Sequence, residues 1–370
     1  MTSISQGALV GPQDQPVLRL RSPADVCEAV PYLVGFEPAE SLVVVSLRGP
    51  RHRAGVTARI DLPDAVTAPM VASLIIDHLE RDGAAAAIVV AYTEEANPGL
   101  AADARSADVA VRAVLDACVD RGIGVAEALR VTAGRWTSYT CSEACCPPGG
   151  TPVRDRLDEP SACAAAMTAE GRQVLAGRSV LEGSIAPARG LLAVAMRARL
   201  NDEVDGFLGA VQSQRSSVYG DATVRLARAW VDRLARGEAL TVDVAARILA
   251  GMLDRDVRDR CLGGGMGSLG RADDPPFPPD ALELWRELVR RALLPGTAAP
   301  VATLLAACAY LDHGNGALAN VALDRALADQ PTYVMARYLR AMLDGGIAPA
   351  KVRQWLDDPG QGADQPAQAG

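Results

Sequence analysis

The first half of the chain alternates short apolar runs with amphipathic segments. Residues 41–47 form a nearly continuous run of β-branched and other apolar side chains, which is typical of a strand buried on both faces. Residues 56–62 alternate in polarity, and this alternation places Arg59 and Asp61 on one face of a second strand. Residues 68–81 carry apolar side chains at helical spacing and end shortly before a glycine. The pattern predicts two strands followed by a helix.

The same alternation continues to the middle of the chain. Residues 86–92 predict another buried strand, and residues 102–121 predict another amphipathic helix. Residues 125–131 and 134–139 predict two strands joined by a tight turn. Because strands and helices alternate here, we expect an α/β domain with a mixed sheet over residues 17–153.

The start of this domain carries a helix signal. Ser22 can cap a helix, Pro23 suits the first helical position, and Asp25 stands where a capping-box partner belongs. We therefore expect a leading helix that ends near Leu33. Residues 1–16 are polar and without periodicity, and they predict a disordered tail.

The second half of the chain shows no strand pattern. Residues 154–262 predict a helical domain, because apolar side chains recur at helical spacing throughout it. The segments that carry this spacing are residues 162–175, 187–198, 202–214, 222–235 and 242–262. A run rich in Gly and Pro follows at residues 263–279 and predicts a linker.

Three short helices are expected beyond the linker and a further helix at 279–293. They span residues 299–312, 316–329 and 332–343 and resemble about one and a half tetratricopeptide repeats, with Pro331 at the terminating proline. The fold class expected for the second half is therefore all-α, ending in tetratricopeptide-like helices.

This tetratricopeptide-like segment, residues 280–358, predicts protein contacts. Stacked helix pairs of this kind form surfaces that bind peptides or partner proteins. Tyr310, at the Tyr position of the repeat pattern, and Arg337 are the residues that we expect to face a partner. Residues 359–370 predict a second disordered tail.

Composition narrows the class of protein and its surroundings. With 49% hydrophobic and 22% charged residues among 370, the chain has the usage of a soluble globular protein. The net charge is −8 and basic residues are interspersed with acids, so nucleic acid is not an expected partner. The N-terminus lacks a signal-peptide pattern and no apolar run is long enough to span a membrane, so we expect a cytoplasmic protein with reduced cysteines.

Candidate chemistry is concentrated in a cysteine cluster at the junction of the two halves. Cys141 and Cys145 have the spacing of a zinc-ligand pair, Cys146 adds a third thiol, and Cys163 could complete a four-cysteine site. The alternatives are a redox-active thiol pair, a thiol nucleophile, or partly buried thiols of a compact turn. The residue pattern does not decide among these interpretations. A structural zinc ion is the one cofactor that the cysteine spacing suggests.

A second candidate site lies at strand ends of the α/β domain, where ligands bind in open sheets. Its polar and aromatic side chains are those of Arg59, Asp61, Glu94, Trp136 and Ser138. The opposing interpretation is a surface ion pair, a solvated acidic loop and a packed indole ring. No glycine-rich phosphate loop follows a strand, so the sequence does not indicate a nucleotide.

Several stretches together resemble an actinobacterial family catalogued as domain of unknown function 4192. They are LRSPADVCEAVPYLVGFEPAESLVVVSL, ARIDLP, GRWTSYTC, CCPPGGTP, DRDVRDRCL and ALANVALDRALADQPTYVMARYLRAMLDGG. The similarity spans about residues 18–355 and implies an actinobacterial cytosol, but it implies no activity, substrate or catalytic residue.

Three functions are therefore kept as hypotheses. The first is a protein-interaction or regulatory module with a protein partner. The second is an enzyme or small-molecule binder with a site near Trp136, Ser138 and the Cys141–Cys146 turn. The third is a zinc- or thiol-based sensor that uses the cysteines of that turn.

Overall fold

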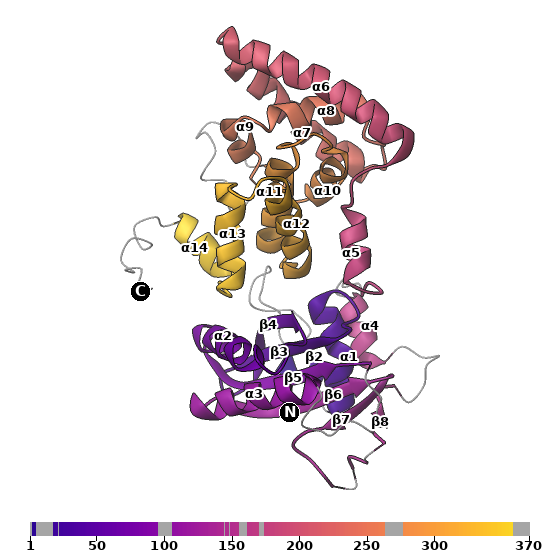
Figure 1. Ribbon diagram of the computed structural model, residues 1–370, viewed down its shortest axis with the longest axis vertical. Helices are drawn as coiled ribbons and strands as arrows, with labels where there is room; N and C mark the ends of the chain where they lie inside the picture. The colour runs from indigo at the N-terminus through magenta and orange to yellow at the C-terminus, as the bar shows by residue number, and fades with distance from the viewer. Residues whose placement is uncertain are drawn as a thin grey trace. The chain divides into compact units, whose positions relative to one another are not determined.

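The chain forms two compact units, Met1–Arg178 and Ser179–Gly370 (Figure 1). The computed structural model describes residues 2–4, 18–20, 22–94, 106–143, 145–147, 149–154, 161–169, 174–262 and 277–357. Most of the predicted linker and the whole predicted C-terminal tail lie outside these ranges.

The first unit contains a mixed sheet, as the sequence predicts. In its described part the strand order is β2-β1-β4-β3-β5-β6-β7-β8. The strands are β1 (Thr2–Ile4), β2 (Leu18–Leu20), β3 (Ser41–Arg48), β4 (Arg53–Asp61), β5 (Ala84–Tyr92), β6 (Gly124–Thr132), β7 (Arg135–Ser138) and β8 (Thr151–Pro152). β3 is antiparallel to both of its neighbours, whereas β5 and β6 are parallel. β1, which lies in the segment predicted to be a tail, pairs with β2.

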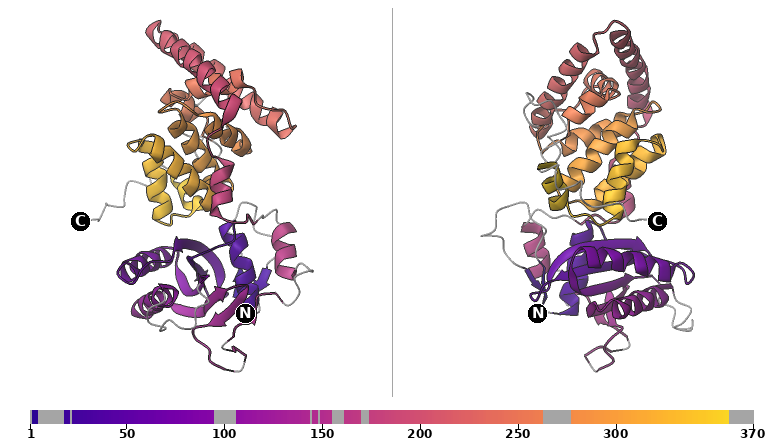
Figure 2. Two further views of the ribbon diagram at one scale, coloured as in Figure 1. Left: turned by 45° about the vertical axis from the view of Figure 1, so that its right-hand side comes forward. Right: turned by 90° about the vertical axis from the view of Figure 1, so that its left-hand side faces the viewer.

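Helices cover both faces of this sheet (Figure 2). α2 (Ala68–Arg81) and α3 (Ser106–Asp120) pack on one face against alternate side chains of the central strands, such as Val44 and Val89. The intervening side chains point to the other face, where the Tyr92 hydroxyl donates to the Cys27 carbonyl at 3.1 Å. Cys27 belongs to α1 (Pro23–Val34), and α4 (Ala162–Ala169) packs against α1. The unit therefore has three layers.

Two local signals in the sequence are confirmed. Ser22 and Asp25 form a reciprocal capping box at the start of α1, with backbone-to-side-chain distances of 3.1 and 3.2 Å. Ala133 and Gly134, which join β6 to β7, have φ angles of 48° and 72°. Two positive φ angles in a two-residue hairpin loop define a type I′ turn.

A buried carboxylate ties α2 to the sheet. The Asp82 side chain is 6% exposed and follows α2 directly. Its Oδ2 accepts from Ser46 Oγ on β3 at 2.6 Å and from the Val56 backbone on β4 at 3.0 Å. A Cβ on Gly55 would lie 1.9 Å from that oxygen, so only glycine fits beside it.

The second unit is helical throughout its described residues. After α5 (Arg178–Ser184) come α6 (Gly190–Gln212), α7 (Ser216–Ala235), α8 (Val242–Gly251), α9 (Arg255–Arg260), α10 (Leu282–Arg291), α11 (Ala298–Ala307), α12 (Gly316–Asp329), α13 (Val334–Asp344) and α14 (Pro349–Asp357). A π-helical turn, Cys308–Asp312, extends α11. Among the helices so described, none has the length and apolar character that crossing a bilayer requires.

Helix boundaries in this unit differ from the predicted ones. The segments predicted at 187–198 and 202–214 form one helix, α6, because no glycine or proline separates them and Met196, Leu200 and Phe207 keep one buried face. The segment predicted at 242–262 is broken where Asp254 caps a new helix, α9. The tetratricopeptide-like arrangement is not confirmed; α12 packs against both α11 and α13.

Candidate functional site

Three cysteine thiols meet in the loop between β7 and β8. The Sγ of Cys141 lies 3.7 Å from the Sγ of Cys145, which lies 3.9 Å from the Sγ of Cys146. All three sulfurs lie within 4.8 Å of one another. Cys145 is exposed, and the other two are half-buried. This group, Cys141, Cys145 and Cys146, is called the thiol cluster below.

Backbone hydrogen bonds shape the loop that carries the thiol cluster. Ser138 Oγ accepts from the backbone N–H groups of Thr140 and Cys141, both at 3.1 Å, as β7 ends. The Cys146 N–H then donates to the Glu143 carbonyl at 2.8 Å. This turn brings Cys145 and Cys146 back toward Cys141.

An arginine fixes the far end of the loop. Arg135 on β7 donates from Nε to the Gly149 carbonyl at 2.8 Å and from Nη2 to the Gly150 carbonyl at 2.6 Å. Gly150 has a φ of 70° and turns the chain into β8, which pairs with β7. Both ends of the loop are thus bonded to β7, so the cluster lies at the β7–β8 edge of the sheet.

Two thiols of the cluster have pKa values that are shifted in opposite directions. The Glu143 backbone N–H, with the thiols of Cys146 and Cys145, lowers the pKa of Cys141. Partial burial, together with the hydrogen bonds to Cys141 and Cys145, raises the pKa of Cys146 to about 12. Because neighbouring thiolates repel one another, one sulfur ionises readily and holds a proton on its neighbour.

The sulfur separations fit a tetrahedral metal ion. Zinc binds thiolate sulfur at about 2.3 Å, so two sulfurs on one tetrahedral ion lie about 3.8 Å apart. The separations of 3.7 and 3.9 Å match that edge length. Two of the three sulfur separations therefore suit a shared tetrahedral ion, and all three sulfurs lie within 4.8 Å of one another, so the thiol cluster can supply three of four ligands.

Cys163, the fourth ligand suggested by the sequence, does not join the cluster. It lies on α4, is buried, and its Sγ is 4.0 Å from the Asp25 carbonyl of α1. Burial, reinforced by the negative charge of Glu28, raises the pKa of this thiol to about 12. Cys163 is a core thiol of the α1–α4 layer.

The residues predicted to form a pocket at strand ends do not converge. Arg59 is on β4 and Trp136 on β7, with β3, β5 and β6 between them, which is a separation of about 19 Å at usual strand spacing. Arg59 pairs with the exposed Asp61 at 2.8 Å and donates to the buried Ser41 at 2.9 Å, so its polar contacts are local to β4 and β3.

The other two members of that set also have local roles. The backbone N–H of Glu94 donates to Glu40 Oε1 at 2.5 Å at the end of β5. Ser138 caps the cysteine loop, as described above. The hydrogen bonds of Ser138 and Cys145 in the described part of the chain go to loop backbone, Thr140 and other thiols, so no histidine or carboxylate is positioned to activate either as a nucleophile.

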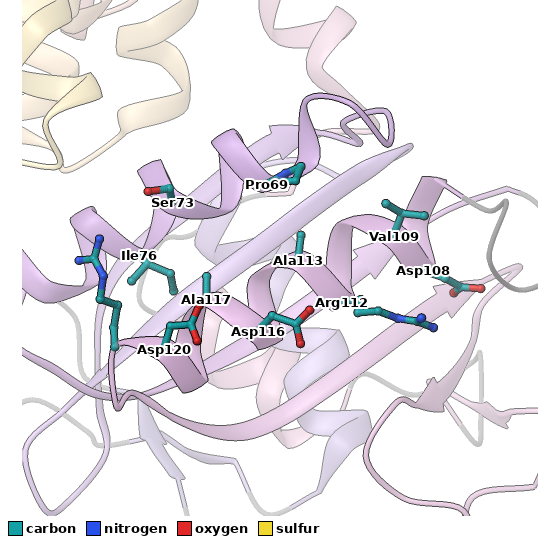
Figure 3. Close-up of a pocket in the computed structure, with 11 residues that line it drawn as sticks. Pro69, Ser73, Ile76, Asp108, Val109, Arg112, Ala113, Asp116, Ala117 and Asp120 are labelled. Carbon is teal, nitrogen blue, oxygen red and sulfur yellow. The ribbon is translucent and has the colours of Figure 1, made fainter.

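A cavity that the sequence did not suggest lies between α2 and α3 (Figure 3). Its volume is about 550 Å³, and its walls include Ile76 from α2 and Ala113 and Ala117 from α3. Asp116 and Asp120 border it from successive turns of α3. Their spacing of four residues is visible in the sequence, but the packing of the two helices is not.

The two residues expected to contact a partner have different environments. Tyr310 is buried, donates its hydroxyl to the Ile347 carbonyl, and has its pKa raised to about 12 by burial. Arg337 is exposed on α13 beside Val334 and Tyr338, which are 58% and 66% exposed. Of these two residues, Arg337 is accessible to a partner and Tyr310 is not.

The fold and the thiol cluster define a two-unit protein whose α/β unit carries a surface thiol site. The family model described as a domain of unknown function (DUF4192) matches residues 23–350, which is most of the chain, so the chain belongs to that family. The match confirms the resemblance to this family, and the actinobacterial origin that the resemblance implies stays a prediction. No curated protein and no solved structure is significantly similar to the chain.

Proposed function

We propose that the protein binds a zinc ion through Cys141, Cys145 and Cys146 and acts as a metal- or thiol-responsive module. The observation that carries this proposal is the match between the sulfur separations of 3.7 and 3.9 Å and the edge of a zinc–thiolate tetrahedron. Zinc bound there would cross-link the loop and keep one coordination position for a fourth donor.

The chain's own groups prepare this site. Cys141, whose pKa is lowered, presents the first thiolate, and Cys146 gives up its proton when a cation offsets the repulsion between the sulfurs. Ser138 and Arg135 hold the two ends of the loop, so the sulfurs are gathered before binding. A reducing cytoplasm, which we expect from the sequence, would keep the thiols available.

The test is the zinc content of the full chain and of single-cysteine variants. Cys141→Ser and Cys145→Ser should each lower the bound zinc well below one ion per chain, because two thiolates remain. Cys163→Ala is the matched control, since it removes a thiol outside the cluster and should leave the zinc content unchanged. Equal zinc in all four proteins would refute the proposed site.

A redox response is the second function that the cluster supports. The Cys141 and Cys145 sulfurs are 3.7 Å apart, and the pKa of Cys141 is lowered, which favours its reactive thiolate. Hydrogen peroxide would oxidise this thiolate and the Cys145 thiol to a disulfide, and would itself be reduced to one water and one hydroxide. Peptide mapping of the zinc-free protein after peroxide treatment tests this redox response. If no Cys141–Cys145 disulfide forms, the redox response is excluded.

The helical unit supports a protein-interaction role. On α13, Val334, Arg337 and Tyr338 form an exposed group that combines apolar, aromatic and cationic side chains, which are enriched at interfaces. Tyr338→Ala should then weaken a partner's binding while the control Leu191→Ala, an exposed residue on α6, should not. Indistinguishable binding by both variants would remove α13 as the contact.

A further inference from the structure

The outer side of α2 carries an apolar strip. Val66, just before the helix, Met70 and Leu74 are spaced four residues apart and are 88%, 61% and 52% exposed. Met70 and Leu74 lie four residues apart on one side of α2, and Val66 adds an exposed apolar side chain in the turn just before the helix. Exposed large apolar side chains gathered in this way mark an interaction surface more often than isolated ones do.

The strip runs beside the cavity between α2 and α3. Pro69, Ser73 and Ile76, on neighbouring positions of α2, line that cavity of about 550 Å³ (Figure 3). Ala113 and Ala117 line it from α3. The strip and the cavity together are called the α2–α3 surface below.

Two carboxylates, those of Asp116 and Asp120, border the same surface, which Arg112 also lines. Asp116 and Asp120 are exposed, and neither pairs with a basic group within the described ranges, whereas Arg121 is taken by Asp77 and Glu80 at 3.4 and 2.6 Å. Like charges four residues apart destabilise a helix. Asp120 also ends α3, whose last turn has no basic residue, so it faces the negative end of the helix dipole.

We propose that the α2–α3 surface docks a basic amphipathic helix of another protein. Its apolar side chains would cover the strip and enter the cavity, and its Lys or Arg side chains would reach Asp116 and Asp120. The surface suits a helix because its apolar positions repeat at helical spacing, as in other helix-in-groove complexes. The cationic side chains would pair with these two carboxylates, which form no ion pair within the described ranges. This proposal is independent of the thiol cluster.

The test uses synthetic helical peptides and the full-length protein. The first peptide places Leu at helical spacing with Lys on the flanks, the second replaces each Lys by Glu, and the third has the first composition in scrambled order. Binding is measured by fluorescence anisotropy. The first peptide should bind at least tenfold more tightly than the other two. Equal binding of the scrambled peptide would contradict the proposal, because charge alone would then explain the affinity.

Variants locate the binding on the protein. Met70→Glu with Leu74→Glu, and Asp116→Lys with Asp120→Lys, should each weaken the first peptide at least tenfold. The control pair, Leu191→Glu with Asp205→Lys, changes the same residue types on α6 and should leave the affinity unchanged.

Two further outcomes complete the test. Hydrogen exchange on the wild-type protein should show new protection in α2 and α3 when the peptide binds, independently of any variant's folding. If spermidine displaces the peptide fully and the Met70 and Leu74 changes have no effect, the surface is a small-cation site and the helix proposal is refuted.

Discussion

The affinity of the thiol cluster for zinc should rise steeply as the pH rises. The pKa of Cys146 is raised to about 12, so this thiol is fully protonated between pH 6.5 and 7.5 in the metal-free protein. A metal ion binds the thiolate and must therefore displace that proton. One displaced proton makes the association constant rise about tenfold per pH unit. Cys141 adds less to this slope, since its lowered pKa leaves fewer protons to displace.

The measurement is zinc affinity at pH 6.5, 7.0 and 7.5 by competition with a chromophoric chelator whose own protonation is corrected. The logarithm of the association constant should rise with a slope of at least one. In Cys146→Ser the slope should fall by about one, because a hydroxyl gives up no proton on this scale. A slope near zero in the wild type, or an unchanged slope in the variant, would show that Cys146 is not a ligand.

Further predictions concern the two units separately. Gly55→Ala should destabilise the first unit by about 2–4 kcal/mol, because its methyl group would overlap the buried Asp82 carboxylate. Gly206→Ala, on the exposed side of α6, should instead stabilise the second unit by about 0.5–1 kcal/mol. Asp329→Ala should cost about 1–3 kcal/mol, since its carboxylate accepts from the backbone of Gly296 at 3.0 Å and from two N–H groups that begin α11. Urea unfolding of each variant checks the signs, and an opposite sign in any one would refute its explanation.

The strands and helices of the first unit were predictable because their signals are local. A strand covered on both faces, such as β3 or β5, must be apolar at nearly every position, and that run is visible in the sequence. The Ala133–Gly134 turn and the Ser22 cap also depend only on neighbouring residues. Short strands such as β1 and β2 have too few residues to show a period.

The thiol cluster was predicted only in part. The sequence identified Cys141, Cys145 and Cys146 because they are close along the chain. It also suggested Cys163, but that residue's place is set by packing of α4 on α1, which no spacing rule reports.

The residues of the predicted pocket lie on separate strands for a related reason. Sequence order does not give strand order, and three strands separate β4 from β7. The α2–α3 cavity was missed because it depends on two helices packing side by side on the sheet. Strand order and helix–helix packing can be read only from the tertiary structure, whereas caps, turns and buried strands can be predicted from neighbouring residues.

Zinc stoichiometry of the full chain, purified without a metal-affinity tag, tests the central claim most directly. Plasma mass spectrometry on the intact protein should find about one zinc per chain, and chelation should release it while exposing three more reactive thiols. Cys141→Ser should carry little zinc, and Cys163→Ala should carry as much as the wild type. The account would be contradicted if the wild-type protein held no zinc even after incubation with zinc, and if its cluster thiols reacted equally with and without chelator.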